Sequence, residues 1–469
     1  MRSALGIPTA PVGNPLPLGQ LPVGLEDTIR AINAPINNFA WGWPTVTLIA
    51  LTGLVMMVGL GFMPLRRLPY GVRMTLGHAG SAKDGEISPF QALMTSLSAT
   101  IGTGNIAGVA GAIAVGGPGA VFWMWLIAIF GIATKYAEAV LAVHFRELDP
   151  LGNHVGGPMY YIRNGLGPGW AWLGGLFALF GMLAGFGIGN GVQCFEVSSA
   201  LQTVGIPRLV TGVVLGALVF GVIIGGISRI AQAASAVVPT MAILYVVACL
   251  LIILANASEI PAAFGTIFSN AFTGKAAASG TLAQVILMGF KRGIFSNEAG
   301  LGSAPIAHAA ASTRDPVRQG TVAMLGTFID TIIICSMTAL VIIITGAYES
   351  GESGANLSIS AFNIGIAGSG WMVTVGLVVF AFTTVLGWSF YGERCTEYLF
   401  GVKAILPFRL VWVAVVVIGS VAGDRGAVWA VADTLNGLMA IPNLIGLLLL
   451  SGTVFRLTRA YRFDGEARS

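Results

Sequence analysis

The chain has 469 residues, of which 55% are hydrophobic and only 9% are charged. An ordinary soluble domain carries roughly 25% charged residues, so this composition excludes a soluble globular protein and indicates an all-α polytopic membrane protein. The net charge of +4 is small and spread among the loops, which gives no reason to expect a nucleic-acid partner. The first 40 residues are rich in Pro and Gly and do not resemble a secretory signal peptide.

Long apolar segments predict eleven membrane spans, because roughly 20 residues are needed to cross a bilayer. In chain order they lie at 43–63, 89–115, 119–145, 169–199, 208–226, 228–255, 281–311, 318–346, 370–400, 407–423 and 427–455. Residues 1–42 precede the first span as an N-terminal segment, and residues 456–469 follow the last one as a tail. Segment 256–280 is too polar to span and is expected to form a loop with a short surface helix.

The distribution of Lys and Arg predicts the orientation of these spans. If the N-terminus lies outside, the inside loops and tail collect sixteen Lys and Arg residues and the outside ones only five. Positive residues concentrate on the cytoplasmic side of membrane proteins. We therefore expect segments 1–42 and 256–280 to be extracytoplasmic and the C-terminal tail to be cytoplasmic.

Two of the predicted spans are broken near their centres by clusters of Gly, Asn, Ser and Thr. The first break covers residues 98–108 and the second covers residues 293–304. Lipid cannot satisfy unwound backbone, which survives at membrane depth only inside protein or beside a cavity. Paired interrupted spans are typical of the binding site of a secondary transporter. The two spans are five helices apart and therefore run in opposite directions, which predicts inverted repeats at 89–255 and 281–455, preceded by an extra helix at 43–63.

The first break contains the residues Gly102, Thr103, Gly104 and Asn105. Their spacing is not that of a dinucleotide-binding loop, and no strand precedes them. Gly104 and Gly108 could serve only to pack helices closely. Packing does not explain the neighbouring Thr and Asn residues, however. A helix that restarts after the break can bind a carboxylate at its N-terminus, and the carbonyls freed before it suit a small cation.

The second break adds charged residues, Lys291, Arg292 and Glu298, within a span. Ionisable groups at this depth indicate function unless they only pair with one another to hold helices together. Both interpretations remain open from the sequence. Their possible counter-charges are Glu196, Asp330 and Asp433. Arg292 and Asp433 could instead form an outer gate.

Helix 370–400 carries Thr383 and Thr384, with Trp388 one turn later. Adjacent Thr hydroxyls often bond back to the preceding turn, but they can equally complete an oxygen cage around a cation. The amides of Asn190 and Gln193 are costly in an apolar span and must find partners, either between helices or in a central site.

The remaining residue types exclude several functions. The four His residues lack metal-ligand spacing and none accompanies a nucleophile motif, so we do not expect an enzyme. The four Cys residues lie inside apolar segments, which argues against a disulfide framework. A channel would show a continuous polar stripe or a repeated filter sequence, which is not seen.

Several stretches of the chain resemble the alanine or glycine:cation symporters, also called sodium:alanine symporters. They are ATIGTGNIAGVAGAIAVGGPGAVFWMW (99–125), ATKYAEAVLAVHFR (133–146), GGPMYYI (156–162), FKRGIFSNEAGLGSAPIAHAAA (290–311) and PVRQGTVAMLGTFIDTIIICSMTALVI (316–342). The resemblance extends from about residue 40 to residue 455. It implies a LeuT-type fold with a five-plus-five inverted repeat and one extra helix.

The resemblance also implies sodium-driven import of alanine or glycine across a prokaryotic plasma membrane, with no obligate protein partner. The substrate-binding residues that it implies are Gly102, Thr103, Gly104, Asn105, Gln193, Phe295, Thr384 and Trp388. The sodium ligands that it implies are Ser98, Ile101, Thr383 and Thr384. A proton-coupled transporter that uses Glu196 or Glu298 is the alternative on the same fold. The sequence does not rank alanine against glycine.

Overall fold

The computed structural model describes residues 23–76, 85–273, 280–422 and 427–463. Most of the predicted N-terminal segment and the last six residues of the predicted tail lie outside these ranges. Its α-helices are α1 (Val23–Ala40), α2 (Trp43–Gly59), α3 (Met63–Arg66), α4 (Leu68–Leu76), α5 (Pro89–Thr100), α6 (Val109–Gly116), α7 (Ala120–His144), α8 (Pro158–Leu166), α9 (Ala171–Ala184), α10 (Val192–Gln202), α11 (Arg208–Ile223), α12 (Gly226–Ala255), α13 (Ile260–Ala271), α14 (Leu282–Asn297), α15 (Ala304–Ala309), α16 (Pro316–Thr327), α17 (Ser336–Ile344), α18 (Gly354–Gly365), α19 (Gly370–Phe400), α20 (Ile405–Val421) and α21 (Ala427–Ala460).

Each of the eleven predicted spans contains helix, and the α-helical membrane protein expected from composition is confirmed. Among the described residues, eight helical segments are long and apolar enough to cross a membrane, and the bent pair α5 and α6 raises this number to nine. Three segments with π-helical hydrogen bonding interrupt the helices: η1 (Gly104–Gly108), η3 (Gly185–Gly191) and η5 (Phe328–Cys335). The count of eleven and the inverted repeat remain predictions.

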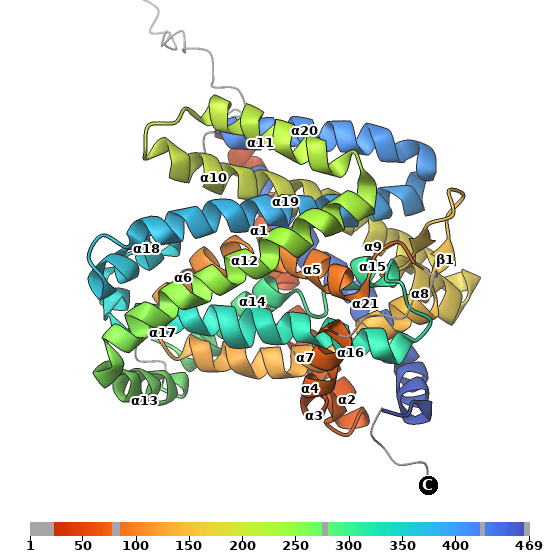
Figure 1. The fold of residues 1–469 in the computed structure, drawn as a ribbon, viewed down its shortest axis with the longest axis horizontal. Coiled ribbons are helices and arrows are strands. Elements are labelled where there is room, and N and C mark those ends of the chain that lie inside the picture. Colours follow the sequence, from red (N-terminus) through yellow and green to blue (C-terminus); the bar gives the residue numbers. More distant parts are fainter. Residues whose placement is uncertain (1–22, 77–84, 274–279, 423–426, 464–469) are drawn as a thin grey trace, which may run out of the picture.

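The long helices α7, α16 and α19 run in roughly the same direction in Figure 1, and α12 crosses them obliquely. The short helices α13 and α18 lie at one end of this bundle, and α8 lies at the opposite end with strand β1 (Glu147–Leu148) (Figure 1). Strand β1 pairs antiparallel with β2 (His154–Val155). Helix α13 is the short helix that the polar segment 256–280 predicted.

The first predicted span begins where expected, since α2 starts at Trp43, but a further helix, α1, precedes it in the predicted N-terminal segment. Helix α1 lies against the start of α21. The amide nitrogen of Asn37 donates to the carboxylate of Asp433 at 3.0 Å and to the hydroxyl of Thr434 at 2.9 Å. The indole nitrogen of Trp41 donates to the carbonyl of Asp433 at 2.8 Å. These polar partners explain why a helix of mixed composition forms outside the predicted span.

The first break lies at Ile101 and Gly102, where the helix axis bends by 53° between α5 and the helix that resumes at Gly104. The second break is shorter than predicted, because residues 293–297 remain part of α14. Gly293 serves close packing instead, since a Cβ there would lie 2.6 Å from the Ile127 side chain on α7. The unwound residues follow Asn297, where Gly300 and Gly302 have φ values of +90° and +83°.

Side-chain caps and a backbone bridge fix the ends of the broken helices. Ser88 and Gln91 form a reciprocal capping box at the start of α5. Just before it, Ile87 pairs with Ala311, which follows α15. The guanidinium of Arg146 donates to the carbonyls of Ala309 and Ala311 at 2.9 and 2.8 Å. The start of one broken helix and the end of the other are therefore joined at the same place.

Helix α19 packs against the first break without a gap. A Cβ atom on Gly387 would lie 2.7 Å from the hydroxyl oxygen of Ser98 and 2.8 Å from the backbone nitrogen of Ala99. Backbone cannot move aside as a flexible side chain can. The glycine therefore sets the distance at which Thr383, Thr384 and Trp388 face the break.

We predict that Gly387→Ala destabilises the protein by about 1–3 kcal/mol, because the added methyl overpacks a helix contact. Thermal unfolding in detergent would detect this as a lower midpoint. Gly175→Ala on α9 is the matched control, since a Cβ there would meet nothing within 4 Å. An unchanged midpoint for both variants would contradict the close contact.

Candidate functional site

The two breaks meet at a small buried cavity of about 20 Å³, measured as the space open to the centre of a water molecule. Its lining residues come from both breaks, from η3 and α10, from α19 and from α21. They are Ala99, Thr100, Gly102, Thr103, Gly104, Ile188, Gln193, Phe295, Glu298, Thr384, Trp388 and Asn436. Seven of the eight residues predicted to bind a substrate thus line one cavity, and Asn105 is the exception.

Asn105 holds the first break open from outside the cavity. Its side-chain oxygen accepts a hydrogen bond from the Gly102 amide at 2.9 Å. In a continuous helix that amide would donate to the carbonyl of Ser98, so the Ser98 carbonyl loses its helical donor. The amides of Thr103 and Gly104 open the next helix, and the first amides of a helix have no partner within it. The break therefore presents carbonyl oxygens on one side and N–H groups on the other.

The same Asn105 side chain connects the first break to the second. Its nitrogen donates to the carboxylate of Asp330 at 2.7 Å and to the hydroxyl of Ser296 at 3.1 Å. Ser296 and Thr331 each donate to the second oxygen of Asp330 at 2.8 Å. The Asp330 carboxylate is fully buried and accepts hydrogen bonds from side chains of both broken spans. This carboxylate therefore acts here as a link between the breaks.

Side chains also replace the helical partners lost at the second break. The amide of Ala299 donates to the side-chain oxygen of Asn297 at 2.9 Å. The amides of Gly300 and Gly302 donate to one carboxylate oxygen of Glu138 at 3.1 and 3.2 Å. In a continuous helix the Ala299 and Gly300 amides would donate to the carbonyls of Phe295 and Ser296. Those two carbonyls are consequently free of helical donors beside the cavity.

The two Thr residues of α19 both bond back to the carbonyl of Phe380, at 2.9 Å for Thr383 and 3.0 Å for Thr384. The Thr384 hydroxyl also lies 3.4 Å from the carbonyl of Ile101 at the first break. Thr384 lines the cavity, whereas Thr383 does not. Since each hydroxyl gives its hydrogen to a carbonyl, its oxygen lone pairs remain available to a cation.

Trp388 is held in a fixed orientation by Glu298. The indole nitrogen donates to one oxygen of the Glu298 carboxylate at 2.9 Å. The Ser303 hydroxyl donates to the other oxygen. On its opposite side Trp388 packs against η3, where a Cβ on Gly189 would lie 2.3 Å from the Trp388 side chain. The bulky ring therefore closes one wall of the cavity.

The two amides of the fourth predicted span have different roles. The nitrogen of Asn190 donates to the Trp412 carbonyl at 2.9 Å, so this amide bonds between helices. Gln193 faces the cavity, and its nitrogen donates to the Ile188 carbonyl at 3.1 Å and to the Thr103 hydroxyl at 3.3 Å.

The proposed gate pair is not in contact in this structure. Among the ion pairs of the described residues, none joins Arg292 to Asp433. The Asp433 carboxylate instead accepts a hydrogen bond from the side-chain amide of Asn37. The guanidinium of Arg292 lies 6.0 Å from the centre of the Phe295 ring, and the ammonium of Lys291 lies 5.6 Å from the Trp41 ring. A gate that closes through Arg292 and Asp433 remains a prediction.

Sequence reasoning missed Lys135, Glu138 and Asn436. Lys135 and Glu138 are ionisable residues inside an apolar span, which is the signal that could have found them. Lys135 is buried, and its ammonium lies in the field of the carboxylates of Glu138, Glu298 and Asp330. Asn436 has no comparable signal, because a single polar residue in the last helix does not show which way it faces.

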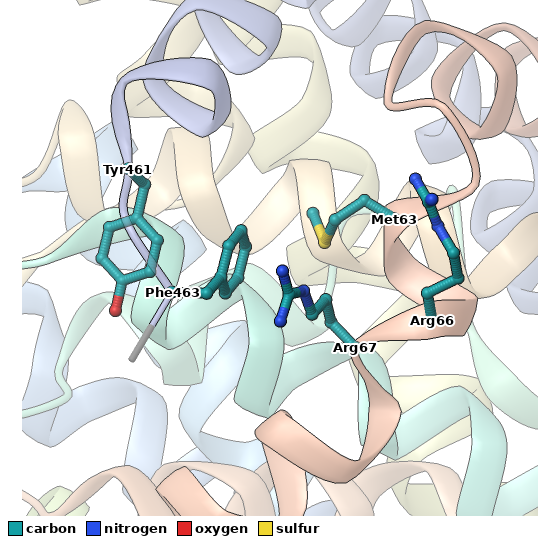
Figure 2. Close-up of a pocket in the computed structure, with 5 residues that line it drawn as sticks. All are labelled: Met63, Arg66, Arg67, Tyr461 and Phe463. Carbon is teal, nitrogen blue, oxygen red and sulfur yellow. The ribbon is translucent and has the colours of Figure 1, made fainter. Parts of the chain in front are cut away.

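A roomier cavity of about 470 Å³ lies elsewhere, where α3 approaches the end of α21. Figure 2 shows the side chains that line it, with the Arg67 guanidinium beside the Phe463 ring. The two groups are 4.5 Å apart, measured from the guanidinium carbon to the ring centre. Neither break contributes to this cavity. Size alone therefore does not identify the functional site.

The chemistry of the small cavity is that of binding rather than of catalysis. It combines N–H groups at a helix start, freed carbonyls, the hydroxyls of three Thr residues and two side-chain amides. Within the part of the chain that the structure describes, no three His, Cys, Asp or Glu residues are grouped as transition-metal ligands. Glu298 is already bonded on both oxygens.

We predict that Glu138→Leu lowers the free energy of unfolding by at least about 2–3 kcal/mol. The substitution leaves the Gly300 and Gly302 amides without an acceptor, and each orphaned buried donor costs about 1–3 kcal/mol. Denaturant or thermal unfolding in detergent would measure the loss. Glu147→Gln is the control: this exposed carboxylate pairs with Arg163 on the surface, where a salt bridge is worth about 0–1 kcal/mol. Equal effects of both variants would contradict the role of Glu138.

The chain is similar in sequence to known membrane transporters. The family model described as "Sodium:alanine symporter family" matches residues 26–468. The chain is 50% identical over 444 residues to the "Sodium/alanine symporter AgcS" of Methanococcus maripaludis, covering 93% of this chain and 97% of the relative. It is 39% identical to the "Probable sodium/glutamine symporter GlnT" of Bacillus subtilis, covering 94% and 93%. It is 37% identical to the "Amino-acid carrier protein AlsT" of the same organism, covering 92% and 91%.

The match covers nearly the whole chain, including both breaks and every element that lines the cavity. The family and these relatives are transporters and not enzymes. The chain therefore belongs to the sodium:alanine symporter family, as a multi-pass membrane protein.

Proposed function

We propose that this protein is a sodium-coupled symporter that imports small neutral amino acids, alanine or glycine, by alternating access. The observation that carries the proposal is the meeting of two broken helices at one small cavity that holds both N–H donors and freed carbonyls. A zwitterion needs a place for a carboxylate and a place for a cationic group within a few ångströms. The two breaks supply both without placing an unbonded carboxylate beside the substrate.

The substrate carboxylate would lie at the N–H groups of Thr103 and Gly104, where the helix dipole favours an anion. Gln193, the Phe295 carbonyl and Thr384 would surround the amino group. Phe295 and Trp388 would leave little room for a side chain. The name of the relative AgcS supports a small substrate, although GlnT carries the name of a larger amino acid.

Sodium would bind between the first break and α19, at the carbonyls of Ser98 and Ile101 and the hydroxyls of Thr383 and Thr384. Three features support this placement. The Ser98 carbonyl has lost its helical donor, Thr384 approaches the Ile101 carbonyl, and both hydroxyls donate elsewhere. Hard cations prefer such oxygen ligands. An ion here would stabilise the contact between α5 and α19.

Transport would proceed by rocking one group of helices against the rest around this fixed site, in a LeuT-type inverted repeat. Sodium and substrate would together favour the closed state, because neither alone supplies enough differential binding energy. The cell membrane of a prokaryote, with the C-terminus in the cytoplasm, is the setting that the charge distribution and the family favour. The alternative is proton coupling through Glu298, whose carboxylate lines the cavity.

The first test is uptake of labelled alanine and glycine into liposomes that contain the purified protein. We expect accumulation with an inward sodium gradient and none with an equal potassium gradient. The double variant Thr383→Val/Thr384→Val should need at least about tenfold more sodium, because it keeps the shape of the side chains but removes both oxygens. Thr383→Ser/Thr384→Ser, which keeps the hydroxyls, is the matched control. Accumulation driven by a proton gradient alone would instead favour the alternative.

The second test concerns substrate size. Phe295→Ala should raise uptake of leucine relative to alanine by about tenfold or more, since one methylene group in a pocket is worth about 1–3 kcal/mol. Competition of unlabelled amino acids against labelled alanine would measure it. Phe290→Ala on α14 is the control, because Phe290 packs against Trp123 and does not line the cavity. An equal change in both variants would show that Phe295 does not limit side-chain size.

A further inference from the structure

Two amide oxygens in the cavity have no hydrogen-bond donor. They are Oε1 of Gln193 and Oδ1 of Asn436, and both are fully buried atoms of residues that line the cavity. The residues are only 3% and 2% exposed. A buried oxygen without a donor is unfavourable, and native proteins rarely tolerate it unless a ligand or water completes the bond.

The orientation of the Gln193 amide follows from its other partners. Its nitrogen donates to the Ile188 carbonyl, which can only accept, so the opposite end of the amide must be the oxygen. A Cβ on Gly102 would lie 3.6 Å from this oxygen. The free acceptor of Gln193 is therefore beside the first break.

The direction of Asn436 is fixed by the helix that carries it. One turn earlier on α21, Asp433 and Thr434 bond to Asn37 of α1. The next residue, Gly437, approaches α1 so closely that a Cβ there would lie 2.9 Å from the Ala40 carbonyl. These contacts prevent rotation of α21 about its axis. Asn436 consequently keeps its side chain toward the cavity, where none of the described residues donates to its oxygen.

A pair of neutral acceptors suits a ligand that carries several hydrogen-bond donors. An ammonium group has three N–H donors and no acceptor. In an α-amino acid the ammonium and the carboxylate share one carbon atom. A carboxylate held at Thr103 and Gly104 therefore brings the ammonium to the part of the cavity beside Gly102, where the Gln193 oxygen lies. Glu298 differs from the two amides, because Trp388 and Ser303 each donate to one of its oxygens and neither oxygen lacks a donor.

We propose that Asn436 is a substrate-binding residue whose Oδ1, together with Oε1 of Gln193, accepts two hydrogen bonds from the α-ammonium of the transported amino acid. This inference rests on the proposed function and assigns α21 a direct part in it. Two uncharged acceptors recognise the ammonium without adding a negative charge that would repel the substrate carboxylate. Bound substrate would join α21 to the first break, which α10 already reaches through the hydrogen bond from Gln193 to Thr103.

The test is the affinity of the purified protein for alanine at saturating sodium, measured by calorimetry. Asn436→Leu keeps the branched shape of the side chain but removes the acceptor, and should weaken binding about 10- to 100-fold, since hydrogen bonds to charged groups are among the stronger ones. Asn436→Asp keeps an acceptor oxygen and should bind alanine within about threefold of the unmodified protein or more tightly. Asn436→Ala removes the amide without adding bulk and should repeat the loss if the Leu variant does not fold.

The order of the alanine affinities of the Leu and Asp variants shows whether Asn436 recognises the substrate or only packs. A residue that only packs would tolerate Leu better than a buried Asp, which is the reverse of the expected order and would overturn the inference. Sodium affinity measured without amino acid should stay within about twofold in every variant. A parallel loss of sodium affinity would assign Asn436 to the ion and would also overturn it. If the unmodified protein binds no alanine with sodium, the proposed function itself fails, whereas normal binding that Asn436→Leu leaves intact refutes only this inference.

Discussion

The structure depends on satisfying backbone groups that two helices expose when they unwind inside a membrane protein. Helical hydrogen bonds are lost at Gly102 and after Asn297, and no water or lipid is available at that depth to replace them. The Asn105 side chain accepts a hydrogen bond from a backbone amide of the first break. The side chains of Asn297 and Glu138 accept hydrogen bonds from backbone amides of the second. Each of these side chains replaces a helical carbonyl as the hydrogen-bond acceptor. The carbonyls that they displace become free to bind a ligand.

The same side chains make the two breaks a single unit. Asn105 reaches across to Ser296 and Asp330, so a movement of one broken span disturbs the bonds of the other. Asn443 of α21 donates to Glu138 at 2.7 Å and connects the last helix to the second break. The buried Lys135 amine lies near the carboxyl groups of Glu138, Glu298 and Asp330, which come from α7, from the second break and from η5. A substrate that bonds to Asn436 would add one more connection between α21 and this unit.

The sequence predicted the site better than it predicted the details of either break. Gly, Thr and Asn in an apolar span are unusual enough to mark 98–108 as interrupted, and the family resemblance named seven of the residues that line the cavity. Glycine alone was ambiguous at the second break, because Gly293 packs in a helix while Gly300 and Gly302 turn the chain. The Thr pair was ambiguous in the same way, since both hydroxyls back-bond and that of Thr384 also approaches the Ile101 carbonyl at the first break.

By itself the sequence determined the class of protein, the positions of the apolar helices and the presence of two interrupted spans, because all three depend on local composition and on the cost of polar groups in lipid. Only the tertiary structure decided which side chains satisfy each break and which residues share the cavity. Glu138, Asp330 and Asn436 reach the breaks from other helices. The direction in which such a side chain points depends on how its helix is rotated against its neighbours, as the contacts of α1 fix α21. Local sequence carries no record of that rotation.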